Sequence, residues 1–288
     1  MIIVFAKRNG IAACPPRKPS SWGWFSTYDG NIVGCLLLGA GMALTGSCPG
    51  TVMVQVGMGL RSGFEVLAGS LLGGVLFSGY AACLKRPVPA AAEGEKKDAL
   101  TVYQKLGVKE ISAVLGYQAA CFSVVLAAMR FLPDSQGRLL NPLVGGLLMG
   151  SSQLISLVLT SNTLGVSSAF EVAGKLFWRV KDQLTGTAKT AAWPDISSIL
   201  FAAGIAAGSA AFWRFSGTPI PVSAYPVTSG KAVLGGLLMA FGSRVAGGCT
   251  SGHGISGMAT LSISSIASVA SMFGGGIALS LALKGLGY

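Results

Sequence analysis

The sequence predicts an all-α, polytopic membrane protein with about seven crossings and an inverted repeat of broken helices. Hydrophobic residues make up 51% of the 288-residue chain and charged residues only 11%, against roughly a quarter charged in a soluble domain. The mean hydropathy is +0.64. Glycine contributes 42 residues, which suits a bundle whose helix backbones approach closely. These observations indicate a chain that lies mostly within a lipid bilayer.

Seven apolar segments are long enough to cross a hydrocarbon core of roughly 30 Å, which takes about 20 helical residues. The first is divided, because small and polar residues separate 31–46 from 52–60. The others are 63–84, 111–132, 142–160, 192–213, 231–246 and 258–283. Since polar connections separate these runs, we expect a helix for each.

The connections orient the crossings, because loops rich in Lys and Arg stay on the cytoplasmic side. The linker 85–109 and the segment 175–189 are basic, whereas 133–141 and 215–230 hold one Arg and none. We therefore place the first pair inside and the second pair outside. The amino terminus falls inside by the same rule, with Lys7, Arg8, Arg17 and Lys18. The net charge of +11 thus reflects membrane orientation and gives no reason to expect a nucleic-acid partner.

The predicted organisation has four parts: a cytoplasmic amino-terminal segment 1–30, a first cysteine element 31–84, a basic cytoplasmic linker 85–110, and a second half 111–288 with a second cysteine element. The apolar run at the start is too short for a signal peptide, so we expect a multi-pass protein of the plasma membrane with the bilayer as its environment. The six cysteines are scattered and there is one histidine. This pattern predicts no metal site, no disulfide framework and no cofactor.

An internal repeat relates the two cysteine elements at an offset of 201 residues. "GCLLLGAGMALTGSC" (34–48) aligns without a gap with "GGLLMAFGSRVAGGC" (235–249), so that Cys48 meets Cys249. Further along, Ser70, Gly73 and Gly74 meet Ser271, Gly274 and Gly275. Three crossings lie between the copies, so we expect the copies to be inverted. Inverted repeats with broken helices are typical of transporters, whose substrate site lies at the repeat interface.

Each copy contains a predicted helix break at its cysteine. "TGSCPGT" (45–51) and "AGGCTSGHGISG" (246–257) place a cysteine among glycines after an apolar half-helix. The amide end of the next half-helix then points into the gap and favours an anion. A third break is predicted in "TSNTLGVSS" (160–168), with Ser161, Asn162 and Thr163 as its polar residues.

The predicted pathway uses thiols, hydroxyls and backbone amides. A neutral thiol is a weak donor and a soft, polarizable group, which suits a small sulfur-containing anion, and we expect the thiol to be neutral while the anion is bound. The pathway residues are Cys48, Cys249, Ser47, Thr51, Thr250, Ser251, His253 and Arg244. The glycines predicted to shape the breaks are Gly46, Gly50, Gly247, Gly248, Gly252 and Gly254.

Two of these residues keep a structural alternative. His253 is either a proton or anion partner, four residues after Cys249, or a helix-capping residue. Arg244 lies within an apolar run, where a charge suggests a functional site, but it could equally be paired with Glu65 or Glu171 as a structural contact.

These motifs resemble the YeeE/YedE sulfur-transport family of membrane proteins that take up thiosulfate. The resemblance rests on "GMALTGSCPGT" (41–51), "GSRVAGGCTSGHGISG" (242–257) with "SMFGGGIA" (271–278), and "SNTLGVSSAFE" (161–171), and covers most of residues 30–284. It implies a pseudo-symmetric hourglass pathway in which Cys48 and Cys249 hand the anion along by S–H hydrogen bonding. A downstream sulfur-carrier protein is a further expected partner.

The chain departs from the family pattern at its beginning. About 30 residues without a crossing precede the first cysteine element, where the repeat and the family lead us to expect two more crossings. We therefore expect either a truncated first half or an early half-site that comes from elsewhere. Three functions are compatible with the motifs. The first is a permease for thiosulfate or a related sulfur anion, which is not an enzyme. The second is a membrane thiol or persulfide relay or sulfurtransferase-type enzyme, and the third is a pore for a neutral solute.

Overall fold

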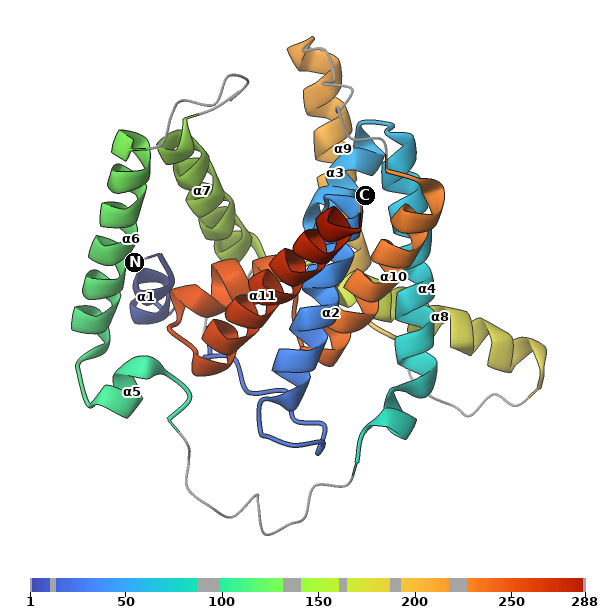
Figure 1. Cartoon of the computed structure of the whole chain (residues 1–288), viewed down its shortest axis with the longest axis horizontal. Helices are drawn as coiled ribbons and strands as arrows, with labels where there is room; N and C mark the ends of the chain where they lie inside the picture. The colour runs from blue at the N-terminus through green and yellow to red at the C-terminus, as the bar shows by residue number, and fades with distance from the viewer. Residues whose placement is uncertain are drawn as a thin grey trace.

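In the computed structural model, the structure describes residues 2–10, 14–86, 99–131, 141–160, 165–186, 193–217 and 227–286, and every regular element in these ranges is a helix (Figure 1). The helices are α1 (Ile2–Arg8), α2 (Asp29–Thr45), α3 (Pro49–Gly57), α4 (Arg61–Leu84), α5 (Val102–Leu106), α6 (Glu110–Phe131), α7 (Pro142–Thr160), α8 (Ser168–Leu184), α9 (Ser197–Ser216), α10 (Ser229–Val245), the π-helix η2 (Thr250–Gly257) and α11 (Ile263–Gly285).

The predicted number of crossings is confirmed. Within the described ranges, six helices or continuous helix pairs are long and apolar enough to cross a membrane, and the bent pair α10 and η2 makes a seventh. The α2–α3 pair counts as one span, while η2 turns away from α10 by 46°. Helix α9 begins five residues later than the apolar run, because Pro194 and Asp195 precede it. The protein is an all-α integral membrane protein.

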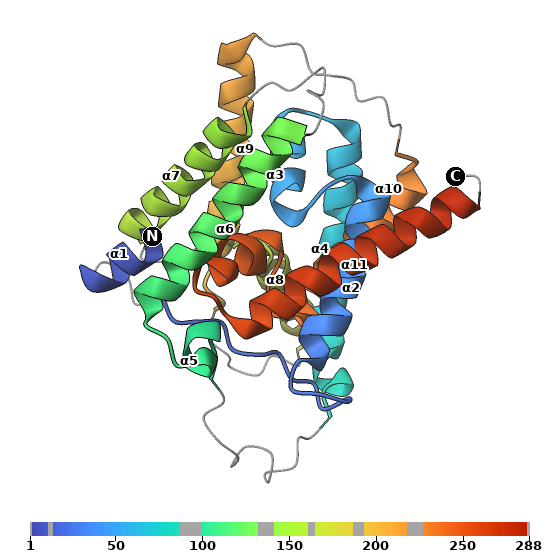
Figure 2. The same ribbon diagram turned by 60° about the vertical axis from the view of Figure 1, so that its left-hand side comes forward.

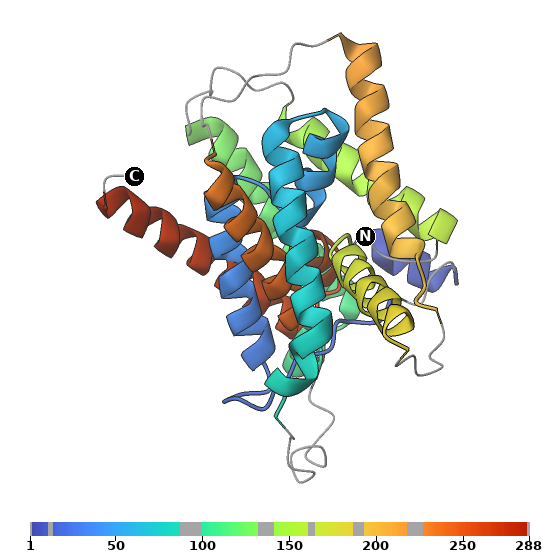
Figure 3. The same ribbon diagram turned by 90° about the vertical axis from the view of Figure 1, so that its right-hand side faces the viewer.

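Helices α2 and α10 form an antiparallel pair at the centre, beside α4 (Figure 3). Their glycines approach each other reciprocally. A Cβ on Gly34 would lie 2.6 Å from the carbonyl oxygen of Gly242, and a Cβ on Gly242 would lie 2.5 Å from that of Gly34. Gly41 and Gly235 approach in the same way. Because the repeat maps Gly34 onto Gly235 and Gly41 onto Gly242, these contacts exchange under a two-fold rotation, as an inverted repeat requires.

The flanking helices obey the same symmetry, since α4 packs on α10 and α11 packs on α2. Their register, however, differs from the predicted one. Gly73 approaches the carbonyl of Leu237, and the equivalent carbonyl, that of Leu36, is approached by Gly275. The offset in these helices is therefore 202, and the predicted pairing of Gly73 with Gly274 and of Gly74 with Gly275 is wrong by one residue.

The π-helix explains this shift. Residues 49–59 separate Cys48 from Leu60, the N-cap of α4, whereas residues 250–261 separate Cys249 from Ser262, the N-cap of α11. The second copy thus holds one more residue between the same two points, and a π-helix, with its wider turn, accommodates one extra residue. The run of three glycines at 274–276 matches the first copy at either offset, so the sequence alone did not expose the insertion.

Residues 14–28 connect α1 to α2 as an irregular segment that passes beneath η2 and α11 (Figure 2). Its polar groups bond to the ends of other elements. Ser262 and Ser264, at the start of α11, both donate to the carbonyl of Arg17, at 2.8 and 2.9 Å. Asp29 accepts backbone N–H bonds from Trp22 and Trp24, each at 2.7 Å. These contacts hold residues 14–28, here called the amino-terminal strap, against the second cysteine element.

Candidate functional site: two cysteine-bearing helix breaks

The first break separates α2 from α3. Gly46 ends α2 in the left-handed conformation, with φ of +62°, and Cys48 is the extended N-cap of α3. Only glycine takes such a positive φ without strain. Thr51 closes a capping box, because its hydroxyl accepts from the Cys48 N–H at 2.6 Å and also lies 3.5 Å from the Cys48 sulfur. The thiol is half-buried and stands at the amide end of α3.

Polar groups at this break are satisfied by neighbours in the sequence. The Thr45 hydroxyl donates to the Gly41 carbonyl at 2.9 Å and accepts from the Ser47 N–H at 3.2 Å. The Ser47 hydroxyl bonds to the Thr45 carbonyl at 3.3 Å. Ser47 and Thr51, both predicted pathway residues, therefore hold the shape of the break through contacts within four positions.

The second break repeats this backbone. Gly247 has a φ of +77°, and Cys249 is the extended N-cap of the following helix. Both predicted breaks are thus confirmed at equivalent residues. The surroundings differ, since Cys249 is fully buried and is followed by a π-helix where Cys48 is followed by an α-helix.

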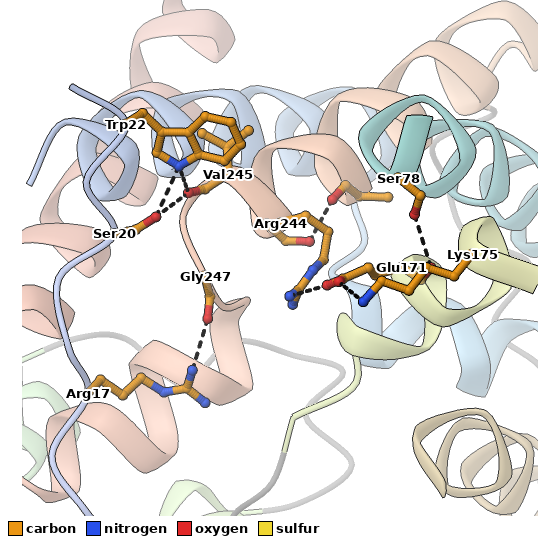
Figure 4. Close-up of polar contacts among 11 residues, drawn as sticks. Arg17, Ser20, Trp22, Ser78, Glu171, Lys175, Arg244, Val245 and Gly247 are labelled. Carbon is orange, nitrogen blue, oxygen red and sulfur yellow. Dashed lines mark hydrogen bonds and ion pairs between the residues drawn. The ribbon is translucent and has the colours of Figure 1, made fainter. Parts of the chain in front are cut away.

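Three consecutive carbonyls at the end of α10 are capped by side chains, and Figure 4 shows those of Val245 and Gly247. The Val245 carbonyl accepts from the Ser20 hydroxyl at 2.7 Å and from the Trp22 indole at 2.9 Å. The Gly247 carbonyl accepts from Arg17 Nη1 at 3.0 Å. The Ala246 carbonyl between them accepts from Asn31 and from His253, both at 3.2 Å. A helix end inside a membrane needs such partners, because the bilayer core offers no water.

The Cys249 thiol lies where three elements meet. Its sulfur is 3.2 Å from the hydroxyl of Ser251, and Gly252 and Ser167 lie close to it. Ser167 is the N-cap of α8, so the amide ends of both η2 and α8 face this sulfur. Thr250, also a predicted pathway residue, is half-buried at the first position of η2.

His253 takes the capping alternative. It is fully buried, its Nδ1 lies 3.1 Å from the Ser265 hydroxyl, and its Nε2 lies 3.2 Å from the Ala246 carbonyl. Because a carbonyl can only accept, Nε2 carries the proton and Nδ1 accepts from Ser265. Both ring nitrogens are therefore occupied by the protein. Val52, at the equivalent position of the first copy, is equally buried.

Arg244 takes the paired alternative. Its guanidinium forms an ion pair with Glu171 of α8, and Lys175 bonds to the same carboxylate at 2.6 Å (Figure 4). Glu65, the other predicted partner, instead pairs with Arg61 at 3.0 Å. The Arg244 charge is thus compensated by a carboxylate on the neighbouring element, and the pair ties the end of α10 to α8.

The glycines around Cys249 make room for side chains. A Cβ on Gly248 would lie 2.9 Å from the His253 ring and 3.1 Å from Arg17 Nη1, and one on Gly252 would lie 3.0 Å from Arg17 Nη2. The guanidinium of Arg17 therefore rests on the two glycines beside Cys249. Gly254 has open space around its Cβ position, and Gly50 has only the Cys48 sulfur at 3.8 Å.

A cavity of about 380 Å³ opens beside this break. Its lining is mainly polar and comes from the amino-terminal strap, the carboxyl end of α7 and the amino ends of α8 and α9: Arg17, Ser156, Thr160, Gly165, Ser168, Asp195, Ser197, Ser198 and Phe201. Burial lowers the pKa of the Arg17 guanidinium, Cys249 opposes that shift and Arg244 adds to it. The N–H and hydroxyl of Ser197 lower the pKa of Asp195.

The two cysteines lie at opposite ends of the α2–α10 pair. Thr45, before the first break, faces Gly235, while Ala246, at the second break, faces Gly34. The eleven residues from 235 to 246, at 1.5 Å each, put about 17 Å between the two levels along the helix axis. A small anion cannot contact both thiols at once.

Comparison of the sequence with known proteins identifies its family. A family model described as sulphur transport matches residues 2–278, nearly the whole chain. The chain belongs to the sulphur transport family. Among relatives, the thiosulfate transporter TsuA of Spirochaeta thermophila is 28% identical over 251 residues, covering 82% of this chain and 72% of that protein. Two proteins of Xylella fastidiosa strains, each described as a probable transporter, are 32% identical over 133 residues, covering 45% of this chain and 83% of the relative.

Some site residues of this sulphur transport family protein did not emerge from the sequence. Arg17 was assigned only to membrane orientation and Ser198 only to an apolar run, while Ser167 belonged to the predicted third break without a role of its own. Gln153 of α7 accepts from Ser256 of η2 at 3.2 Å, and its own amide nitrogen is buried without a partner. The polar residues of α7 recur at 153, 156 and 160, which is one helix face and the available signal. The third predicted break, with Ser161, Asn162 and Thr163, lies outside the described residues.

Proposed function

We propose that this protein carries thiosulfate, or a related small sulfur-containing anion, across the plasma membrane, and that Cys48 and Cys249 contact the anion on its way. The observation that carries the proposal is the pair of cysteines at N-cap positions of two inverted helix breaks in a member of the sulphur transport family. The name of the TsuA relative supports thiosulfate as the substrate.

The chemistry of the breaks fits an anion. An N-cap residue stands before backbone N–H groups that lack partners within the helix, and the partial positive charge at that end attracts negative charge. The thiol adds a weak S–H donor whose sulfur is polarizable. At Cys249 a second amide end, that of α8, faces the same sulfur. An anion that leaves water for this region exchanges its hydration for fixed donors.

The spacing of the cysteines implies two separate binding stations. With about 17 Å between their levels, the anion leaves one thiol before it reaches the other, so the polar groups between the stations take part in the transfer. Such a path serves transport of an intact anion and needs no covalent step at sulfur. A cytoplasmic sulfur-carrier protein would then receive the anion after release.

Uptake of radiolabelled thiosulfate by cells that lack another route for it tests the proposal. We expect uptake above the empty-vector level with the wild-type protein, and an initial rate lowered by about tenfold or more in Cys48→Ala and in Cys249→Ala, equivalent to the loss of one donor contact to a charged ligand. Cys83→Ala is the matched control, because this thiol is exposed on α4 away from both breaks. Protein in the membrane fraction is quantified for each variant.

Each outcome separates the competing functions. Absence of wild-type uptake, with protein present in the membrane, would overturn the proposed transport. Full uptake in both Cys249→Ala and Cys249→Ser would overturn the role of the thiol while leaving the substrate in place. A persulfide trapped on wild-type Cys48 or Cys249 during uptake would favour thiol relay chemistry over transport of the intact anion.

A further inference from the structure

We propose that Arg17 is an anion-binding residue, which docks the transported anion in the cavity beside Cys249. The inference rests on the proposed function, because it names the group that receives a sulfur-containing anion next to the second thiol. Arg17 belongs to the amino-terminal strap, which has no counterpart in the cysteine motifs of either repeat.

The position of the guanidinium is the first observation. Its Nη1 and Nη2 atoms lie against Gly248, which precedes Cys249, and Gly252 of η2, where a Cβ would come within 3.1 and 3.0 Å of them. Arg17 lines the cavity together with Gly165 and Ser168. These two residues lie on either side of Ser167, the α8 N-cap residue close to the Cys249 sulfur. The Arg17 guanidinium, the cavity and the Cys249 thiol are therefore neighbours in the structure.

The spare hydrogen-bonding capacity of Arg17 is the second observation. A guanidinium carries five N–H donors, and within the described ranges one acceptor, the Gly247 carbonyl, is bonded to Arg17. In the same part of the chain no carboxylate forms an ion pair with it. Arg244, by contrast, is ion-paired with Glu171, a carboxylate that it shares with Lys175. Arg17 therefore keeps donors and charge available for a ligand.

The rest of the cavity suits a small oxyanion. Ser198 contributes a hydroxyl that is buried and has no hydrogen-bond partner among the described residues. Asp195 also lines the cavity, but both of its carboxylate oxygens are engaged by Ser197, at 2.9 Å to the N–H and 2.8 Å to the hydroxyl. A volume of about 380 Å³ holds a small oxyanion together with several waters, each of which takes about 30 Å³. A planar fork of donors opposite a hydroxyl matches the oxygens of such an ion.

The test compares the concentration dependence of thiosulfate uptake in Arg17→Gln, Arg17→Lys, Ser198→Ala and Lys18→Gln. Glutamine removes the charge and shortens the side chain, but it keeps an amide N–H donor. We expect Arg17→Gln to raise KM by about tenfold or more with a maximal rate within about twofold of wild type, since a charge-assisted contact is lost. Arg17→Lys keeps the charge but not the planar fork and should restore part of the affinity, and Ser198→Ala should raise KM about threefold. Lys18→Gln makes the same charge change on an exposed neighbour and should leave KM unchanged.

Two results would overturn the proposal. One is an unchanged KM in Arg17→Gln. The other is a reduced maximal rate with unchanged KM in both Arg17 variants, which would mean that the residue only holds the break. If wild-type cells take up no thiosulfate, the proposed transport fails, and thiosulfate binding to the purified protein decides on Arg17 independently: affinity present in wild type and lost in Arg17→Gln supports docking, whereas equal affinity, or none in either protein, rejects it.

Discussion

The two helix breaks share a backbone and differ in what completes it. At the first break, Thr45, Ser47 and Thr51 bond to backbone groups no more than four positions away. At the second break, Ser20, Trp22 and Arg17 bond to carbonyls more than 220 positions away. The comparison shows that one motif can be duplicated as a backbone shape while its support is rebuilt, once from local hydroxyls and once from a separate segment.

This difference predicts that damage to the amino-terminal strap opens the second break more than the first. Trp22 is buried, caps Val245 and packs edge-on against Phe77, so Trp22→Ala should lower the free energy of unfolding by about 3–5 kcal/mol. The unfolding temperature of the detergent-purified protein measures this loss.

Thiol labelling localises the same effect. In a background without Cys14, Cys35, Cys83 and Cys121, a small thiol reagent should modify half-buried Cys48 faster than buried Cys249. Trp22→Ala should then raise the rate at Cys249 more than that at Cys48. Equal acceleration at both cysteines would show that the strap stabilises the whole bundle and not one break.

A second prediction uses glycines that the repeat makes equivalent. A Cβ on Gly34 meets the backbone of Ala246 and the Gly242 carbonyl, whereas a Cβ on Gly235 first meets the Thr45 side chain, at 2.5 Å. Backbone yields less than a side chain, so Gly34→Ala should destabilise by about 2–3 kcal/mol and Gly235→Ala by about 1 kcal/mol. Unfolding of both variants under the same conditions checks the ratio. A larger loss in Gly235→Ala would contradict the reasoning.

A further small effect is expected at a position where η2 and α3 carry different residues. His253→Val gives the second copy the residue of the first, Val52. The Ser265 hydroxyl loses its partner, while the Ala246 carbonyl keeps Asn31, so we expect a loss of about 1–2 kcal/mol and an unchanged KM for thiosulfate. A KM that rises several-fold would instead place His253 in contact with the anion, since its capping role does not touch the substrate.

The sequence predicted the features that periodicity, length and motif can carry. The seven crossings follow from apolar runs of membrane length, and the breaks at Cys48 and Cys249 follow from glycine and proline in those runs. The one-residue insertion was hidden because glycines 274–276 match at two offsets. The strap was unpredictable for a different reason: Arg17, Ser20 and Trp22 act as single donors to backbone carbonyls, and such bonds leave no repeating pattern in the chain.

The capping of the carboxyl end of α10 changes the electrostatic environment of an ion beside the second break. The last carbonyls of a helix carry its partial negative charge, and here those of Val245, Ala246 and Gly247 all point at donors. The amide ends of η2 and α8 beside them face the Cys249 sulfur. The second break is therefore asymmetric in its polarity: side-chain donors screen the negative end of α10, while the positive amide ends lie beside the Cys249 thiol.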